Sequence, residues 1–394
     1  MEKESILNQI MTKNQLQNLV NLNIVAIADQ LFNNLNEREK DVLTRRFGLH
    51  GQKRETLESI GGQHGLTRER IRQIESGSIN KVRKYPELEQ AVGQLRQSIT
   101  QLLTGHGGIM SQDHLFTTLQ QLSKAEVEPQ VFNNYLHFLT SKVLQDEIVK
   151  VSNANYFNRL FKLKHQSLDH LEAVAKELLA VIQAKKQLLS TSELINTVKA
   201  LPTYQSQSDK FDVSQIDLGD LAPIVGVESA DRALYAFLDA LTDVEQNKFG
   251  FWGHKTWREI NPKTINDKIY LVLKYNGQPM YYGDIAQKIS ELGFDHKKVN
   301  TATTHNELIL DDKYILVGRG LYGLKEWGYK QGTVADVIAD ILADANQAFN
   351  KQEITDRVLK QRLVKQTTIN LALMNKDRFN KTSEGKYQLK QNQA

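Results

Sequence analysis

The chain has 394 residues, 40% of them hydrophobic, with a net charge of +4 and no cysteine. A chain of this length exceeds one hydrophobic core and predicts roughly two to four domains. The lack of cysteine excludes disulfides and zinc–cysteine modules. No apolar run has the length of a membrane span, and no signal peptide is visible. These features predict a folded, cytoplasmic, multidomain protein.

The N-terminal part of the chain predicts two consecutive helical segments. Residues 1–34 space their apolar side chains for one amphipathic face and predict a helical leader. Asn36 and Glu39 then have the spacing of a capping box, which begins a helix. That helix is expected to end near Phe47 and Gly48.

Residues 56–84 predict a short helix, a glycine turn and a second helix capped by Thr67. Ile71, Ile74 and Val82 recur at helical spacing and are expected to face inward. The outward side chains of the second helix are then Arg68, Glu69, Arg70, Arg72 and Gln73. Arginine recognises guanine, glutamine recognises adenine and glutamate accepts from cytosine, so this helix suits a DNA major groove. The plain alternative is a solvated helix face.

The segment Leu35–Lys84 closely resembles region four of the bacterial sigma-70 family of transcription initiation factors, the module that recognises the minus-35 promoter element. The resemblance is carried by LNEREKDVLTRRFGL, TLESIG and LTRERIRQIE. It implies that three side chains face base edges: Arg68, Glu69 and Gln73. It implies phosphate contacts for Arg70, Arg72, Lys81 and Arg83.

The same resemblance implies that Phe47, Leu49 and Val82 contact the flap of the RNA polymerase beta subunit. Ordinary core packing is the alternative for these three apolar residues. Gly62 and Gly77 depart from the family pattern, because glycine weakens helix interiors by roughly 1 kcal/mol. The sequence therefore predicts that the recognition helix frays after Ser76.

Charge is distributed unevenly along the chain. Residues 36–84 hold twelve Lys/Arg against seven Asp/Glu, a net charge of +5, whereas residues 165–263 hold ten against fourteen, a net charge of −4. Nucleic-acid affinity comes largely from neutralised phosphates. The first segment is thus the expected DNA contact, and the acidic one is expected to face protein or solvent.

A local pattern recurs downstream of the first module. A large apolar residue is followed four positions later by an acid and five later by Ile or Leu, after Leu189, Met280 and Phe349. A weaker copy follows Met110, where Asp113 precedes His114. The copies are 79, 91 and 69 residues apart, a spacing that indicates tandem small domains.

From Thr264 the order is helix, helix, helix and a two-stranded hairpin, which is the order of a winged helix. Residues 264–329 resemble the winged-helix module of the bacterial RNA polymerase delta subunit and of the HARE-HTH family. The predicted fold is therefore mainly α, a helix–turn–helix domain at 35–86 followed by tandem winged-helix domains with small β-hairpin wings. These units are expected at 95–164, at 168–260 (acidic and interrupted by a polar insertion), at 264–329 and at 331–390.

The winged units offer further candidate DNA contacts at Lys297, Lys298, Lys376 and Arg378. Winged helices also dock proteins, and both interpretations stay open. The last unit holds ten Lys/Arg against seven acids over residues 331–390 and is the better DNA candidate. Gly318, Gly320 and Gly323 are expected to turn a wing, because the context of a phosphate-binding loop is missing.

The ten histidines never form His-x-x-x-His, so no metal site is predicted. No catalytic or cofactor-binding pattern is found either. The leading hypothesis is a nucleoid-associated, sigma-like factor that binds promoter DNA and RNA polymerase and is not an enzyme. Only about 34 residues precede the region-four-like segment, too few for the sigma domain that captures and melts the minus-10 element. Three explanations stay open: half of a split sigma with a second protein that melts DNA, an activator that tethers polymerase, and a specialised factor with substituted parts. One alternative to the leading hypothesis is a DNA-binding regulator that does not bind polymerase. Another is a polymerase-associated scaffold whose winged helices dock proteins.

Overall fold

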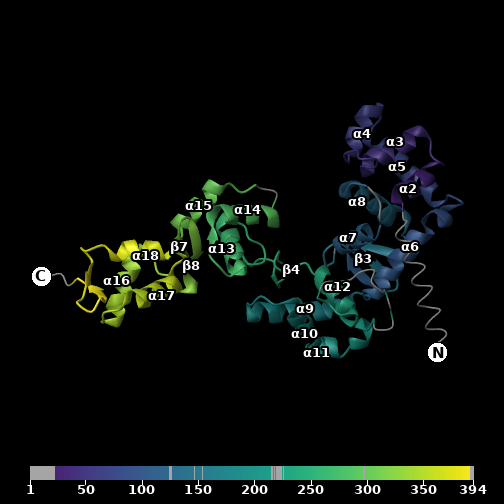
Figure 1. Ribbon diagram of the computed structural model, residues 1–394. Coiled ribbons are helices and arrows are strands. Elements are labelled where there is room, and N and C mark those ends of the chain that lie inside the picture. The colour runs from purple at the N-terminus through teal and green to yellow at the C-terminus, as the bar shows by residue number, and fades with distance from the viewer. Residues whose placement is uncertain are drawn as a thin grey trace. The chain divides into compact units, whose positions relative to one another are not determined.

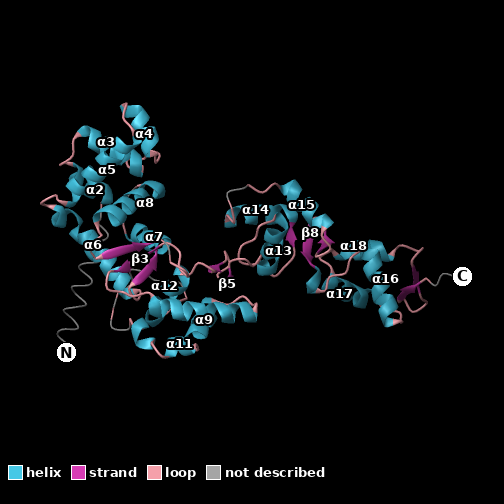
Figure 2. Cartoon of the chain, turned by 180° about the vertical axis from the view of Figure 1, so that it is seen from behind, coloured by secondary structure: helices cyan, strands magenta, loops and turns pink. Residues whose placement is uncertain are grey.

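The computed structural model describes residues 23–123, 127–145, 147–152, 154–213, 216, 218, 224, 226–295 and 298–390. These residues form two compact units. The first unit consists of the chain up to Gln246 together with residues 250–255. The second consists of residues 247–249 together with the chain from Thr256 onward. Helices dominate both units and strands are short (Figures 1 and 2), so the predicted mainly α fold is confirmed. Most of the predicted leader lies outside the described residues, and its end forms helix α2 (Ile24–Phe32).

The helix–turn–helix module consists of α3 (Glu37–Phe47), α4 (Leu57–His64) and α5 (Arg68–Arg83). Asn36 caps α3 as predicted, because its Oδ1 accepts the Glu39 N–H at 2.9 Å and its own N–H donates to the Glu39 carboxylate at 3.0 Å. The helix ends at Gly48, whose φ of +67° is left-handed. Both predicted ends of α3 are confirmed.

The prediction that the recognition helix frays after Ser76 is wrong. Helix α5 continues without a break through Gly77 to Arg83. Ser78, Ile79 and Val82 are buried beyond the glycine, so tertiary packing outweighs its low helix propensity.

Four winged-helix-like units follow, each built on three helices of eight or more residues, and the second also contains the short helix α11 (Pro202–Gln205). The first helices are α6 (Leu88–Gly105), α9 (Asp169–Lys185), α13 (Ile265–Asn276) and α16 (Val334–Ala345). The second helices are α7 (Gln112–Leu122), α10 (Thr191–Lys199), α14 (Tyr282–Leu292) and α17 (Lys351–Gln361). The third helices are α8 (Pro129–Phe138), α12 (Arg232–Ala240), α15 (Thr301–Leu310) and α18 (Gln366–Leu373).

An antiparallel hairpin closes each unit. The four hairpins are β2 (Ile148–Val151) with β3 (Leu160–Leu163), β4 (Val244–Gln246) with β5 (Trp252–His254), β7 (Tyr314–Gly318) with β8 (Leu321–Leu324), and β9 (Phe379–Lys381) with β10 (Tyr387–Leu389). Gly320 lies in the β7–β8 turn with a φ of +68°, as expected for a wing.

The recurring sequence pattern marks a third strand position beside each wing. Its large apolar residue pairs with an aromatic residue of the hairpin in every unit: Met110 with Phe161, Leu189 with Trp252, Met280 with Tyr322, and Phe349 with Tyr387. Two of these contacts belong to strands, β1 (Ile109–Ser111) and β6 (Met280–Tyr281), and two are single bridges. The second helix then starts at once, so the pattern records one repeated strand-to-helix junction.

The helix–turn–helix module and the first winged unit share one hydrophobic core, which contains buried residues from Ile24 to Leu163. Helix α8 lies against α2 and α3 (Figure 1). The ring of Phe138 packs 5.6 Å from Phe32 and 5.0 Å from Phe47, measured between centroids. The third helix of this winged unit is therefore a packing element.

The second winged unit also docks through its third helix, α12. The backbone of Asn158 donates to the Ala240 carbonyl at 2.8 Å, and the Ser111 hydroxyl donates to Asp239 at 2.5 Å. In the other compact unit, the third and fourth winged units meet through buried Arg362, whose Nη1 donates to the Leu316 carbonyl at 2.9 Å.

Mild acid should destabilise the first compact unit. Burial lowers the pKa of His106 to about 3 and, helped by neighbouring cations, that of His137 to about 4. The unfolded chain therefore binds more protons than the folded chain below about pH 6.5. We expect the free energy of unfolding to fall as the pH drops from about 6.5 to about 5, which is above the ordinary pKa values of Asp and Glu.

Urea unfolding followed by circular dichroism at about pH 7.5 and pH 5 measures this effect. His137→Gln should reduce the difference between the two midpoints, whereas the exposed His165→Gln should not. An unchanged difference in His137→Gln would show that this histidine does not cause the acid sensitivity.

Candidate nucleic-acid interface

A small apolar core fixes the angle between α4 and α5. Val42, Ile60 and Ile71 are fully buried in it, and Leu57, Leu66 and Ile74 pack against them. The turn depends on Gly61, because a Cβ there would lie 2.6 Å from the carbonyl oxygen of Leu66. Gly65 ends α4 with a φ of +64°.

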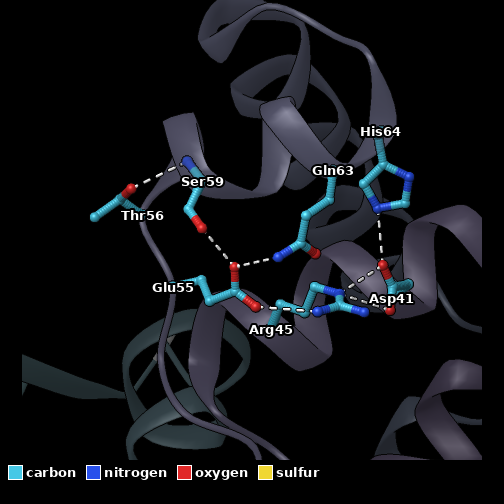
Figure 3. Close-up of polar contacts among 7 residues, drawn as sticks. All are labelled: Asp41, Arg45, Glu55, Thr56, Ser59, Gln63 and His64. Carbon is cyan, nitrogen blue, oxygen red and sulfur yellow. Dashed lines mark hydrogen bonds and ion pairs between the residues drawn. The ribbon is translucent and has the colours of Figure 1, made fainter.

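A polar network holds α3 to the start of α4, as Figure 3 shows. Arg45 lies between two carboxylates: its Nε donates to Asp41 at 2.9 and 3.0 Å, and its Nη1 donates to Glu55 at 3.0 Å. These charge-assisted bonds raise the pKa of Arg45. The guanidinium therefore joins the two segments through one side chain.

The same two carboxylates also bind α4. The Glu55 carboxylate accepts from the Ser59 hydroxyl at 2.7 Å and from the Gln63 amide at 3.0 Å, and these bonds, together with Arg45, lower its pKa. His64 Nε2 lies 2.8 Å from an Asp41 oxygen. Asp41 and Glu55 thus hold α4, and with it the turn into α5, against α3.

Helix α5 begins as predicted at Thr67, whose hydroxyl accepts the Arg70 N–H at 3.2 Å. The outward side chains of its first turns are all exposed: Arg68, Glu69, Arg70, Arg72 and Gln73. Arg72 contacts Glu69 through two hydrogen bonds of 2.8 and 2.6 Å, which lower the pKa of Glu69.

Arg70 donates to Gln73 at 3.1 Å. Two predicted base contacts, Glu69 and Gln73, are therefore paired with two predicted phosphate contacts. Within the described residues, Arg68 forms no hydrogen bond or ion pair. Exposed pairs of this kind are weak, so a stronger partner can replace them.

The last two predicted phosphate contacts have partners in the structure. Lys81 Nζ lies 2.7 Å from a Glu39 oxygen. Arg83 donates to the Lys142 carbonyl at 2.6 Å and to the Gln145 side chain at 2.5 Å. Arg83 thereby ties α5 to the turn that follows α8.

The three residues predicted to contact polymerase lie in the core. Phe47 is 5% exposed, and Leu49 and Val82 are fully buried. All three belong to the core that the module shares with the first winged unit. In this structure they offer no surface to a partner, and the core-packing alternative accounts for them.

The four predicted DNA contacts in the later winged units differ in exposure and in ion pairing. Lys297 lies outside the described residues. Lys298 and Lys376 are exposed and have no ion-pair partner in the described structure. Arg378 contacts Asp336 at 2.6 Å and so joins the cap of α16, where hydrogen bonds from Thr333 and then Arg378 lower the pKa of Asp336.

The structure also brings together a group that sequence analysis missed. Arg54, His137 and Arg159 line one cavity in the first compact unit, and Lys150 lies beside His137. No sequence motif signals this cluster, because its members come from segments far apart in the chain.

Within the described ranges, no helix is long and apolar enough to cross a bilayer. The same residues contain no group of three His, Asp or Glu side chains suited to a metal ion.

The described fold is that of a helix–turn–helix module followed by winged-helix-like units. Comparison with known proteins gives the class of the first module: residues 31–84 match the family described as Sigma-70, region 4. The chain is 43% identical over 60 residues to RNA polymerase sigma factor RpoS of Coxiella burnetii, covering 15% of this chain and 17% of that protein. It is 49% identical over 55 residues to RNA polymerase sigma factor SigA of Lactococcus lactis subsp. cremoris, covering 14% and 15%.

A third relative is RNA polymerase sigma factor RpoD of Helicobacter pylori, 42% identical over 69 residues, or 17% of this chain and 10% of that protein. The chain thus spans less than a fifth of the length of these curated relatives. No solved structure matches. The similarity to sigma-70 region 4 is thus limited to residues 31–84, and it leaves the winged units unexplained.

Three glycine substitutions test the packing of the module. Gly61→Ala should destabilise it by about 1–3 kcal/mol, because the new methyl group meets the Leu66 carbonyl. Gly62→Ala and Gly77→Ala have open space at the new methyl group and should stabilise their helices by about 0.5–1 kcal/mol. Hydrogen–deuterium exchange of α4 and α5 in the full chain measures the changes. Equal effects at Gly61 and Gly62 would contradict the described turn.

Proposed function

We propose that this protein is a DNA-binding transcription initiation factor whose α5 recognises a minus-35-type promoter element. The sigma-70 region 4 match at residues 31–84 supports this proposal. The observation that carries it is the outward face of α5. That polar face stays exposed, whereas packing covers the apolar surfaces of the module.

On DNA, Arg68 is the first base contact, because its guanidinium is exposed and unpaired within the described residues. Glu69 and Gln73 reach base edges once Arg72 and Arg70 leave them for phosphates. The exchange replaces weak surface pairs with contacts to a polyanion, so its cost is small. Lys81 and Arg83 have a lesser part, since both already bind groups of the protein.

A second candidate function is a DNA-binding regulator that does not bind polymerase. The burial of Phe47, Leu49 and Val82 favours it. Under the first proposal, a polymerase contact through these residues requires α8 to leave the module. The third helices of the first two winged units pack within the chain, which supports a docking role for them. Exposed Lys298 and Lys376 remain candidate DNA contacts, and a separate protein would supply promoter melting.

Arg68→Ala should weaken binding to a minus-35-type duplex by about 5- to 150-fold, because one base contact contributes about 1–3 kcal/mol. Binding to a scrambled duplex should change much less. Fluorescence anisotropy of the full chain at fixed salt measures both affinities. Arg38→Ala is the matched control, since Arg38 is exposed on α3 and has no ion-pair partner in the described structure. An equal loss on both duplexes would identify Arg68 as a phosphate contact and contradict base recognition.

Retention of bacterial core RNA polymerase by the immobilised full chain separates the two functions. If polymerase binds the face that α8 covers, Arg83→Ala should increase retention severalfold by releasing Lys142 and Gln145. Lys84→Ala removes the same charge from an exposed neighbour and should leave retention unchanged. If neither the wild type nor Arg83→Ala retains polymerase while duplex binding is intact, the regulator is the better description.

A further inference from the structure

A cavity of about 350 Å³ lies where the helix–turn–helix module meets the first winged unit. Arg54 reaches it from the segment between α3 and α4, His137 from α8, and Arg159 from the residue before β3. Gln112 of α7 and Asn133 of α8 also line it. The wall is thus assembled from three parts of the chain that only the docking of α8 brings together.

Arg54 and Arg159 line the cavity, and Lys150, whose pKa is lowered by burial, lies close enough to both for their charges to lower it further. Lys150 Nζ lies 3.3 Å from His137 Nε2. In the described structure, Arg54, Lys142, Lys150 and Arg159 form no ion pair. Arg54 donates only to a backbone carbonyl, that of Phe47, at 3.2 Å. Asp113 is the single acidic residue in the described lining.

The repulsion between these cations affects the pKa of Lys150, which is half-buried. Burial, and then the charges of Arg159, Arg54 and Lys142, lower the pKa of Lys150. Like charges held close together in a partly dry site raise the free energy of the folded state. An anion in the cavity would remove that cost.

Two amide side chains of the lining have unused hydrogen-bond capacity. Gln112 Oε1 and Asn133 Oδ1 are buried, and neither has a hydrogen-bond partner in the described structure. Buried amide groups nearly always have a partner, and an empty one commonly marks the place of a ligand or water. Because the two ends of an amide are assigned from its surroundings, either end can face the cavity.

We propose that this cavity binds a small phosphorylated molecule of nucleotide type. Its phosphate lies between Arg54 and Arg159, and its N–H or O–H groups face Gln112 and Asn133. Several cations around one point suit a multiply charged phosphate, which guanidinium groups bind with two parallel hydrogen bonds. The volume lies at the lower end of small-molecule sites, which span about 300–1,000 Å³.

A DNA strand carries the same phosphate chemistry but fits the cavity less well. The lining comes from α7 and α8 as well as from Arg54 and Arg159. A continuous backbone follows the surface, whereas a small molecule can fill a cavity of about 350 Å³. It would also link Arg54 of the helix–turn–helix module to the winged unit and so stabilise their docking. The proposal does not depend on DNA binding by α5.

Isothermal titration of the full chain with pyrophosphate and with nucleoside mono-, di- and triphosphates tests the site. We expect saturable one-to-one binding of at least one nucleotide, weakened at least about tenfold in Arg54→Gln/Arg159→Gln. Lys53→Gln/Lys164→Gln removes the same charge from two exposed lysines outside the cavity and should bind like the wild type. The melting temperature of the ligand-free Arg54→Gln/Arg159→Gln chain should equal or exceed that of the wild type, because repulsion is removed.

Gln112→Met tests the orientation of the ligand. It should weaken the nucleotide and leave pyrophosphate unaffected, and equal weakening of both would overturn the assigned contacts. No saturable binding by the wild type, or equal binding by Arg54→Gln/Arg159→Gln, would overturn the site. Loss of duplex-DNA affinity in that variant, without small-molecule binding by the wild type, would assign the cluster to DNA and overturn the proposal.

Discussion

The packing of α8 against α2 and α3 is the contact on which the rest of the first unit depends. The ring of Phe138 lies between Phe32 and Phe47, and the helix–turn–helix module has no separate core on this side. Because α8 covers the apolar face, the module presents the exposed outward side chains of α5 to solvent. The same contact brings Arg83 to Lys142 and encloses the cationic cavity.

The third helices of the winged units follow one order in sequence but differ in environment. Almost every residue of α12 is buried, as expected for a helix with apolar side chains around most of its circumference. Helix α15 buries only Thr304 and Leu308, and α18 only Ile369 and Leu373. The shared winged-helix order thus fixes the local fold, whereas the distribution of apolar residues around the third helix decides whether that helix packs within the chain.

Local signals in the sequence predicted local structure well. The caps at Asn36 and Thr67 and the repeated junction after Met280 and Phe349 each depend on residues a few positions apart. The sequence could not show what covers Phe47, because an apolar residue suits an intramolecular core and a partner surface equally. Nor could it show the cavity, because Arg54 and Arg159 meet only through tertiary packing.

The two cationic groups of the first unit differ in one physical respect. On α5 the charge of Arg72 is balanced by Glu69, and Arg70 binds Gln73, so the exposed helix face carries little electrostatic strain before it meets a ligand. Around the cavity, Arg54, Lys150 and Arg159 repel one another without a counterion in the described structure. A face that exchanges partners suits reversible contact with a polyanion. A cluster that stays uncompensated is stabilised only by an anion that enters it, and this difference distinguishes the proposed DNA-facing surface from the proposed ligand site.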